Sequence, residues 1–154
     1  MQDLYTEAVV SVTEAETALD AARKMERTQV GSLMVLDDVG TLVGMLTGRD
    51  LILNVMAKDV SPSNIRVRDI MTSRPTTMEN DDSLSIFKIT KAMARARVRR
   101  LPIVDSNGKP IGIVTLEDML VKLAEIIANL GHVVAPYLTV ARLQSARDKM
   151  EHKH

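Results

Sequence analysis

Apolar residues along this chain occur either in short continuous runs, as in strands, or three to four positions apart, as in helices. The same order of these two patterns occurs twice. A short apolar run at 9–12 predicts a first strand. Apolar residues three or four positions apart over 18–25 then predict a helix, whose start we place at Thr13 because Glu16 follows it three residues later. Thr13 and Glu16 have the spacing of a capping box.

The next segment of the chain predicts two strands joined by a turn. Apolar runs cover 33–36 and 42–46, and the residues at 37–40, Asp-Asp-Val-Gly, separate them. Asp and Gly favour a tight turn, since Asp hydrogen-bonds its own backbone and Gly accepts a positive φ. A second helix is expected over 48–58.

The second half of the chain repeats this order. Strands are predicted at 76–78, 101–104 and 111–114, with helices over 84–96 and 116–130. The first of these helices is expected to be a few residues longer than its counterpart in the first half. Each half is therefore one strand–helix–strand–strand–helix unit.

An internal alignment shows that the halves are copies. From Gly44 to Gly112 the offset is 68 residues, and upstream an offset of 66 aligns 3–12 with 69–78. Identical residues at the first offset are Val30/Val98, Leu33/Leu101, Asp37/Asp105, Gly40/Gly108, Gly44/Gly112, Thr47/Thr115 and Asp50/Asp118. A unit of about 60 residues buries too little surface to be comfortably stable alone. We therefore expect an α+β fold of two β-α-β-β-α units packed with pseudo-two-fold symmetry, plus a C-terminal helix.

The repeat also predicts the domain organisation. The first copy is placed at 1–60, a linker at 61–65, the second copy at 66–130 and a helical extension at 131–154. Gly131 is expected to end the second copy's last helix. The extension is expected to form a separate helix with Leu138, Ala141, Leu143 and Ala146 on its apolar face.

Composition narrows the class of protein. Lys+Arg and Asp+Glu are both 20 in 154 residues, so no global positive field exists to hold nucleic acid. The chain has no Cys, which excludes disulfides and thiolate metal sites. The N-terminal residues lack the pattern of a secretory signal, and no run reaches the ~18 apolar residues of a spanning helix. A soluble, cytoplasmic protein is expected.

Two related stretches carry candidate chemistry, namely GMLTGRD at 44–50 and GIVTLED at 112–118. In one interpretation Thr47 with Asp50, and Thr115 with Asp118, only cap the helices that follow. In the other, the carboxylate accepts hydrogen bonds from ribose hydroxyls, and phosphate lies at the helix N-terminus. The two interpretations are not exclusive, and the sequence leaves both open.

The densest local charge is the run ARARVRR at 94–100. Arg97 and Arg99 are candidates for a phosphate clamp, because Arg is always charged and binds phosphate through two nitrogens. A solvated helix end explains the run equally well, since cations are favourable near a helix C-terminus.

The ordered set of motifs resembles the CBS domain. The second copy carries VRDIMT at 67–72, RRLPIVD at 99–105 and GIVTLED at 112–118, and the first copy carries looser versions at 31–37 and 44–50. Tandem CBS domains form what is called a Bateman module. The resemblance extends over about 3–122.

The resemblance implies a regulatory module that binds AMP, ADP, ATP or S-adenosylmethionine in clefts between the copies and signals to an unknown partner protein. It also implies a homodimer, no enzyme activity, no cofactor and no metal. The ligand-binding residues that it implies in the first copy are Val10, Ser11, Ser32, Leu33, Thr47, Arg49 and Asp50. Those that it implies in the second copy are Thr76, Thr77, Arg100, Leu101, Pro102, Thr115 and Asp118. Arg49 corresponds to Glu117, so the first site is expected to favour polyphosphate.

Three other classes of function compete with this one. An enzyme is disfavoured, because the only His residues are His132, His152 and His154 and the acidic residues are scattered. A ligand-free dimerisation or interaction scaffold would use the Thr and Asp residues as caps only. A nucleic-acid-associated regulator would use the patch from Arg95 to Arg100, although the zero net charge of the chain argues against nucleic acid as a partner.

Overall fold

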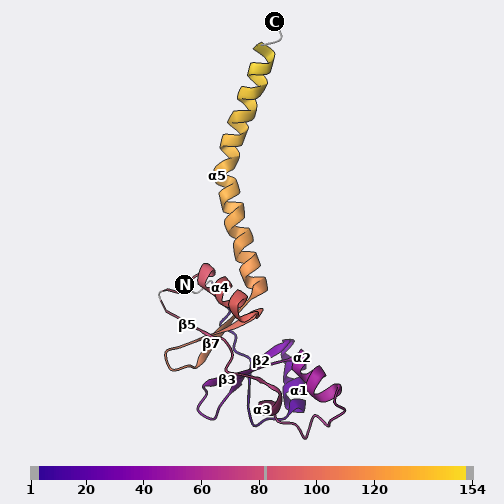
Figure 1. The fold of residues 1–154 in the computed structure, drawn as a ribbon. Helices are drawn as coiled ribbons and strands as arrows, with labels where there is room; N and C mark the ends of the chain where they lie inside the picture. The colour runs from indigo at the N-terminus through magenta and orange to yellow at the C-terminus, as the bar shows by residue number, and fades with distance from the viewer. Residues whose placement is uncertain (1–3, 82, 152–154) are drawn as a thin grey trace. The chain divides into compact units, whose positions relative to one another are not determined.

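The computed structural model describes residues 4–81 and 83–151. The chain divides into two compact units, Met1–Leu116 and Glu117–His154. The first unit contains all the strands (Figure 1), and its fold is α+β as predicted. The elements of the first copy are β1 (Ser11–Thr13), α1 (Ala18–Thr28), β2 (Ser32–Leu36), β3 (Leu42–Thr47), α2 (Gly48–Leu51) and a π-helical turn, η2 (Ile52–Met56).

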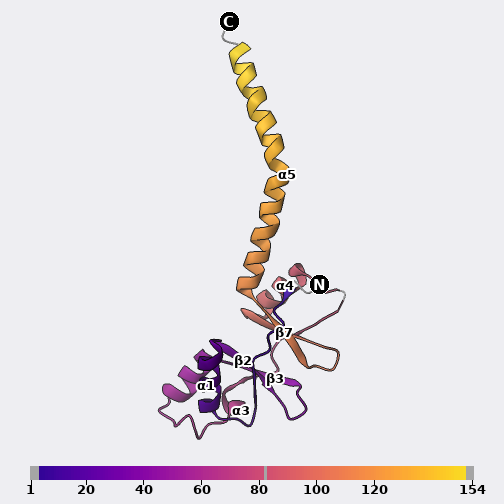
Figure 2. The ribbon, with the colours of Figure 1, turned by 180° about the vertical axis from the view of Figure 1, so that it is seen from behind.

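The second copy repeats this order and adds two short elements before it. Its elements are α3 (Val67–Ile70), β4 (Thr72–Ser73), β5 (Met78–Glu79), α4 (Ile86–Ala96), β6 (Arg100–Val104), β7 (Pro110–Thr115) and α5 (Leu116–Glu151). α1 packs on β2, and α4 packs on β6. Figures 1 and 2 show α1 and α2 together on one side of the first sheet.

Two details of the helices differ from prediction. The capping box of α1 is Thr17 with Asp20, and Thr13 with Glu16 instead forms a turn before the helix, with Thr13 N donating to Glu16 Oε2 at 2.6 Å. Both pairs have the same spacing, so the pattern alone does not choose between them. α4 is not longer than α1, since both contain 11 residues. The predicted helix includes Leu84, whereas in the structure Leu84 precedes the N-cap of α4, Ser85.

The two copies exchange backbone segments. β4 pairs with β3 of the first copy, with Met45 opposite Thr72. Reciprocally, Thr6 pairs with Ile113 of β7, each N–H donating to the other's carbonyl at 2.9 Å. Thr6 aligns with Thr72, and Met45 with Ile113, so the exchange follows the pseudo-two-fold relation of the copies.

Gly44 and Gly112 are required by this exchange. A Cβ at Gly112 would lie 2.3 Å from the ring of Tyr5 and 2.7 Å from the carbonyl oxygen of Thr6. A Cβ at Gly44 would lie 2.3 Å from Sδ of Met71, the residue that aligns with Tyr5. The absence of a side chain therefore lets the exchanged segment approach the strand.

The core of the first copy also includes residues beyond the linker. Val67 and Ile70 of α3 belong to the same buried cluster as Leu33, Val35 and Leu46. Successive strand residues point to opposite faces. Met34, between Leu33 and Val35 in β2, is only 2% exposed, so both faces of this sheet are covered.

The predicted turns between the strand pairs are present in both copies. Gly40 and Gly108 have positive φ, 86° and 76°. Asp105 Oδ1 accepts hydrogen bonds from the backbone N–H groups of Asn107 and Lys109, both at 2.9 Å. The Lys109 bond is the main reason that the pKa of Asp105 lies below its ordinary value.

α5 runs without interruption from Leu116 to Glu151, through both Gly131 and Pro136. The predicted helix end at Gly131 is wrong, and the predicted final helix is the second half of α5. The residues around Gly131 continue the apolar periodicity, which outweighs the ~1 kcal/mol cost of one Gly in a helix. By length and composition alone, Leu116–Val140 could cross a membrane, with a mean hydropathy of 1.3. Among the apolar residues predicted for the final helix, only the side chain of Leu138 is among those described, and it is 55% exposed.

Candidate functional site

A cleft of about 830 Å³ opens in the first unit between the two copies. This volume is in the range of small-ligand sites, roughly 300–1,000 Å³. The cleft is lined by Gly31, Met45, Thr47, Gly48, Arg49, Thr72, Arg74, Pro75, Thr76, Ala96, Arg97, Val98, Arg99, Arg100 and Pro102. Its first-copy residues come from the position before β2, from the end of β3 and from the start of α2. Its second-copy residues come from β4 and the segment after it, and from the end of α4 through the start of β6.

The cleft brings together seven predicted residues. Thr47 and Arg49 come from the first copy's predicted set, and the rest come from the second copy: Thr76, Arg97, Arg99, Arg100 and Pro102. The prediction assigned a separate set of ligand-binding residues to each copy, whereas this one cleft is lined by residues from both copies. The strand exchange explains the combination, because β4 carries the following residues, 74–76, past the edge of β3.

Other predicted residues do not line this cleft: Val10, Ser11, Ser32, Leu33, Asp50, Thr77, Leu101, Thr115 and Asp118. The side chains of Leu33 and Leu101 are fully buried, so only their backbone atoms could face a ligand. Val10 packs against the core of the first copy. Asp118 lies in the first turn of α5 and belongs to the second unit.

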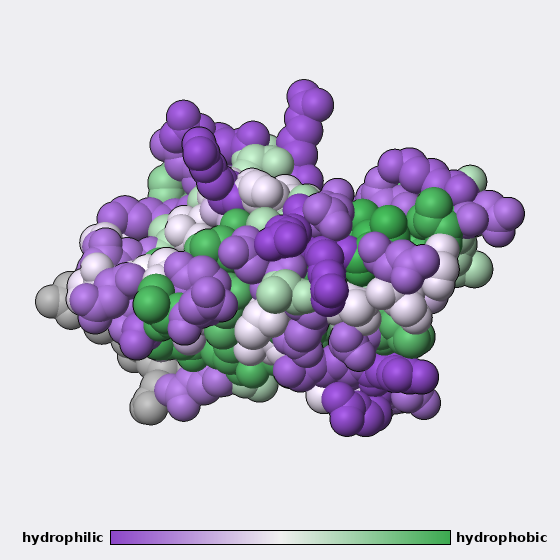
Figure 3. All heavy atoms as spheres, turned by 90° about the horizontal axis from the view of Figure 1, so that it is seen from below, coloured by the Kyte–Doolittle hydropathy of each residue, from purple (hydrophilic) through white to green (hydrophobic). Residues whose placement is uncertain are grey.

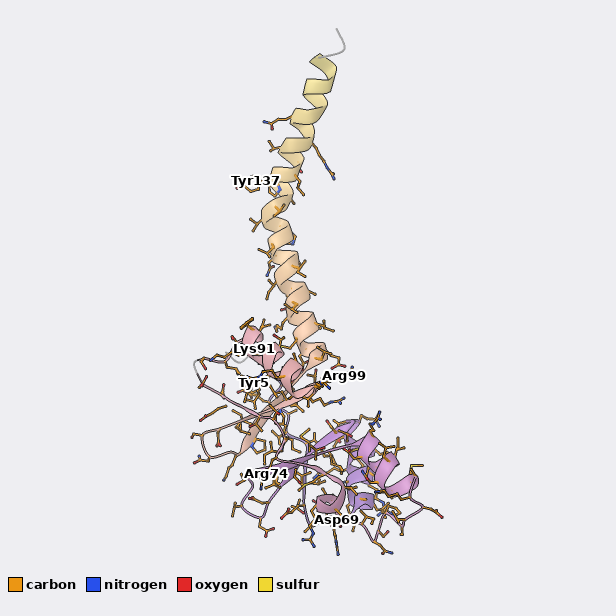
Figure 4. All side chains as sticks on the ribbon, in the orientation of Figure 1. Tyr5, Asp69, Arg74, Lys91, Arg99 and Tyr137 are labelled. Atoms are coloured by element: carbon orange, nitrogen blue, oxygen red, sulfur yellow. The ribbon has the colours of Figure 1, made fainter. Side chains whose placement is uncertain are left out.

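The prediction missed Arg74 of the cleft. Arg74 has a left-handed backbone, φ 49°, and its N–H donates to the carbonyl of Val43 at 3.1 Å. This bond holds the residue beside β3, and Figure 4 labels both Arg74 and Arg99. The sequence signal was available, since Arg74 lies two positions before the predicted Thr76, but an isolated Arg before Pro had no obvious structural role.

Five arginines line one cleft, which makes it strongly cationic. Among the described residues, Arg49, Arg74, Arg97 and Arg100 form no ion pair with a carboxylate. Arg97 is also the left-handed C-cap of α4, φ 55°, so it follows directly after the helix end. Arg95, by contrast, lies in the last turn of α4 and does not line the cleft.

The residues that align with the five arginines include no cation. They are Ala8, Gln29, Gly31, Ser32 and Glu117. The alignment is supported by the backbone, because Gln29 caps α1 in the same left-handed conformation as Arg97 caps α4. The two copies thus share a backbone conformation but differ in the charge that they carry at these positions.

Thr47 and Asp50 form a complete capping box. Asp50 Oδ2 accepts hydrogen bonds from Thr47 N at 2.8 Å and from Thr47 Oγ1 at 2.7 Å, and Asp50 N donates to Thr47 Oγ1 at 3.3 Å. The box of Thr17 and Asp20 has the same three bonds. Among the described residues, no hydrogen bond ends on Oδ1 of Asp50. The cap is therefore established, and one carboxylate oxygen remains for a second role.

The two boxes provide a matched comparison of capping and ligand binding. Asp20→Ala and Asp50→Ala are each expected to lower the free energy of unfolding by up to about 1 kcal/mol, since each removes the carboxylate half of a capping box and leaves the Thr cap in place. Only Asp50→Ala is expected to weaken nucleotide binding as well, by roughly 10-fold for a lost hydrogen bond to a charged group. Urea unfolding and titration calorimetry measure the two effects. Equal nucleotide affinity in both variants would show that Asp50 is a cap only.

A second concave surface lies on the first copy between α1 and η2. It is an apolar groove of about 420 Å³, and among its residues Ile52 and Met56 are 55% and 74% exposed. Figure 3 shows apolar surface on the side that α1 and α2 occupy in Figure 1. Exposed apolar patches of this kind are typical of protein contact surfaces.

The described residues contain no group of three or more His, Cys, Asp or Glu side chains that could hold a metal ion. His132 is exposed on α5, and His152 and His154 lie outside the described residues. The cationic cleft is thus the best-defined candidate site in the part of the chain that is described.

Comparison with known proteins identifies the repeated unit. The family model described as the CBS domain matches residues 1–57 and 67–125. An uncharacterized protein of Methanopyrus kandleri is 38% identical over 112 residues, which are 73% of this chain and 56% of that protein. A CBS domain-containing protein of Bacillus subtilis is 33% identical over 121 residues, 79% of this chain and 83% of that protein. Among solved structures, the CBS-pair protein CBSX2 of Arabidopsis thaliana is 28% identical, with a TM-score of 0.70 over 82% of this chain and 94% of its own.

Proposed function

The chain belongs to the CBS-domain family as a tandem pair, a regulatory and ligand-sensing type of module, and from this we propose that it binds an adenosine polyphosphate in the cationic cleft of the first unit. One observation carries the proposal, namely the convergence of five arginines on one cleft. Four of them form no ion pair among the described residues. A bound anion would offset the electrostatic repulsion between these like charges.

The phosphates would be held by guanidinium groups. Arg74, Arg97 and Arg100 come from different segments of the second copy, so they can contact a phosphate chain from several sides. Arg49 adds a cation from the first copy. This number of cations suits ATP or ADP better than AMP, and it opposes the sulfonium cation of S-adenosylmethionine.

The adenosine would be held by apolar and capping residues. Met45, Val98 and Pro102 line the cleft, and none of the chain's aromatic residues does, so the base would lie between aliphatic side chains. The ribose hydroxyls would face Thr47, which lines the cleft. They would also have to reach Oδ1 of Asp50, the capping partner of Thr47, which does not itself line the cleft. The pseudo-symmetric position would offer no comparable site, because none of the residues that align with the five arginines carries a positive charge.

Ligand binding would act on a partner through a population shift. The cleft residues come from both copies, so a ligand that contacts both changes the relative stability of their arrangements. We place the module in the cytoplasm as a homodimer, with the apolar groove between α1 and η2 as one contact surface. The downstream partner protein would recognise the ligand-dependent state.

Two other functions give different experimental results. A ligand-free scaffold would use the same groove for association and leave the cleft empty. A nucleic-acid regulator would use the Arg95–Arg100 patch, and a gel shift that weakens steeply with salt would reveal it. The concave placement of Arg97 and Arg100 favours a small ligand over either alternative.

A thermal-shift panel tests the proposal. ATP, ADP, AMP and S-adenosylmethionine are added at millimolar concentration, and a specific ligand stabilises the fold by RT ln(1 + [L]/Kd). We expect the unfolding temperature to rise most with ATP and not at all with S-adenosylmethionine. No shift with any of the four ligands would contradict the proposal and support the scaffold.

A further inference from the structure

The exposed part of α5 carries an apolar face that the nucleotide site does not use. Within the second unit, apolar residues recur at alternating steps of four and three: Leu123, Ile127, Leu130, Val134 and Tyr137. Their exposed fractions are 40%, 68%, 59%, 48% and 75%. Steps of four and three give a mean period of 3.5 residues, the repeat of a coiled coil. Figure 4 shows Tyr137 projecting from this helix.

We propose that this face pairs with the same face of a second copy of the chain, as a parallel two-stranded coiled coil. In heptad terms, the a positions are Ile127 and Val134, and the d positions are Leu123, Leu130 and, at the end of the seam, Tyr137. β-Branched residues at a combined with Leu at d favour parallel dimers. The residue types at the seam therefore specify both the number and the direction of the helices.

The flanking positions also fit an identical partner. In a parallel pair, each g residue approaches the e residue of the next heptad on the other helix. Here Ile126 would meet Gly131, and Val133 would meet Leu138. These pairs are apolar, so two identical helices bring no like charges together across the seam.

The buried area is large enough for a stable interface. Each helix would bury the five seam residues and the flanking Ile126, Val133 and Val140, which are 43%, 63% and 55% exposed. Each of these eight apolar side chains would bury an area on the order of 100 Å². Each helix would therefore bury roughly 800 Å², which is the area that one partner buries in a standard interface.

The opposite side of α5 argues against insertion into a membrane. Lys122, Glu125, Asn129 and His132 form a polar stripe there, and Lys122 Nζ lies 3.2 Å from Glu125 Oε2. A membrane-spanning helix would expose this stripe to hydrocarbon, which is costly. A two-stranded coiled coil leaves it in water. Pro136 is at a c position of the heptad, away from the seam.

Because the chain has no Cys, single cysteines test the pairing directly. Leu130→Cys places a thiol at a seam position, where two Cα atoms lie within disulfide reach of about 4.4–6.8 Å. The control is Asn129→Cys, one residue away on the polar side. Under mild oxidation of the full-length protein, we expect Leu130→Cys to form a disulfide-linked dimer at least about 10-fold faster than Asn129→Cys. Adding Ile127→Glu to Leu130→Cys is expected to abolish this difference, whereas adding Ala128→Glu is not.

Several results would overturn the pairing. Equal rates for the two cysteines would show that any dimer forms elsewhere, through the groove between α1 and η2 for example. A monomeric mass by light scattering would exclude association. Flotation of the protein with phosphatidylcholine vesicles would assign the apolar face to a membrane instead. These tests do not depend on nucleotide binding, so they stand whether or not the proposed function holds.

Discussion

Replacing Gly112 with alanine is expected to lower the free energy of unfolding by about 3 kcal/mol, near the upper end for added volume in a packed site. The new Cβ would lie 2.3 Å from the ring of Tyr5 and 2.7 Å from the carbonyl oxygen of Thr6. A side chain can rotate away, but the Thr6 carbonyl is held by its pairing with Ile113. The clash therefore opposes the strand exchange itself. Urea unfolding of the full-length chain measures the loss.

Gly44→Ala and Gly48→Ala are the matched controls. The Cβ at Gly44 mainly meets Sδ of Met71, the end of a flexible side chain, so we expect a loss of only about 1 kcal/mol. The Cβ at Gly48 meets nothing within 4 Å, and alanine there is expected to be neutral or stabilising by up to about 1 kcal/mol. If all three variants had the same stability, close packing of the exchanged segment would not explain the two glycines.

Removing one arginine from the cleft is expected to produce the second large effect. Arg74→Ala and Arg100→Ala should each weaken ATP binding by roughly 10- to 100-fold, because a hydrogen bond between charged groups contributes about 1.5–3 kcal/mol. AMP binding should weaken less, since AMP has only one phosphate. Titration calorimetry with both nucleotides separates these effects.

Arg95→Ala provides the control for net charge. Arg95 belongs to the same basic run but does not line the cleft, so its loss should change ATP affinity by no more than about 2-fold. If Arg95→Ala weakened binding as much as Arg100→Ala, the arginines would act as a diffuse positive surface. A gel shift with nucleic acid would then become the more informative experiment.

Most of the fold could be predicted from periodicity and turn residues. The strand pairs and their Asp-to-Gly turns are local features, so the sequence around each one was sufficient. The exchange of segments was not predicted, because pairing between Thr6 and Ile113 depends on residues far apart in the chain. The start of α1 was misplaced for a different reason, since Thr13 and Thr17 both precede an acidic residue by three positions.

The types of residue in the candidate site could be predicted from the sequence, but which residues of the two copies lie together in one cleft could not. Arg97, Arg99 and Arg100 stand out in the sequence because they lie within four consecutive positions. Their proximity to Thr47 and Arg49 follows from the path of the chain between β4 and β5, which no local pattern specifies. Arg74 was missed for the same reason.

Titration of the full-length chain with ATP and AMP tests the central claim most directly. The charge difference between the copies predicts one strong ATP site per chain, with AMP binding at least about 10-fold more weakly because it lacks the two outer phosphates. Asp50→Ala should weaken this site, and Asp118→Ala should have little effect on it. Two equivalent sites, or equal affinities for ATP and AMP, would contradict the account.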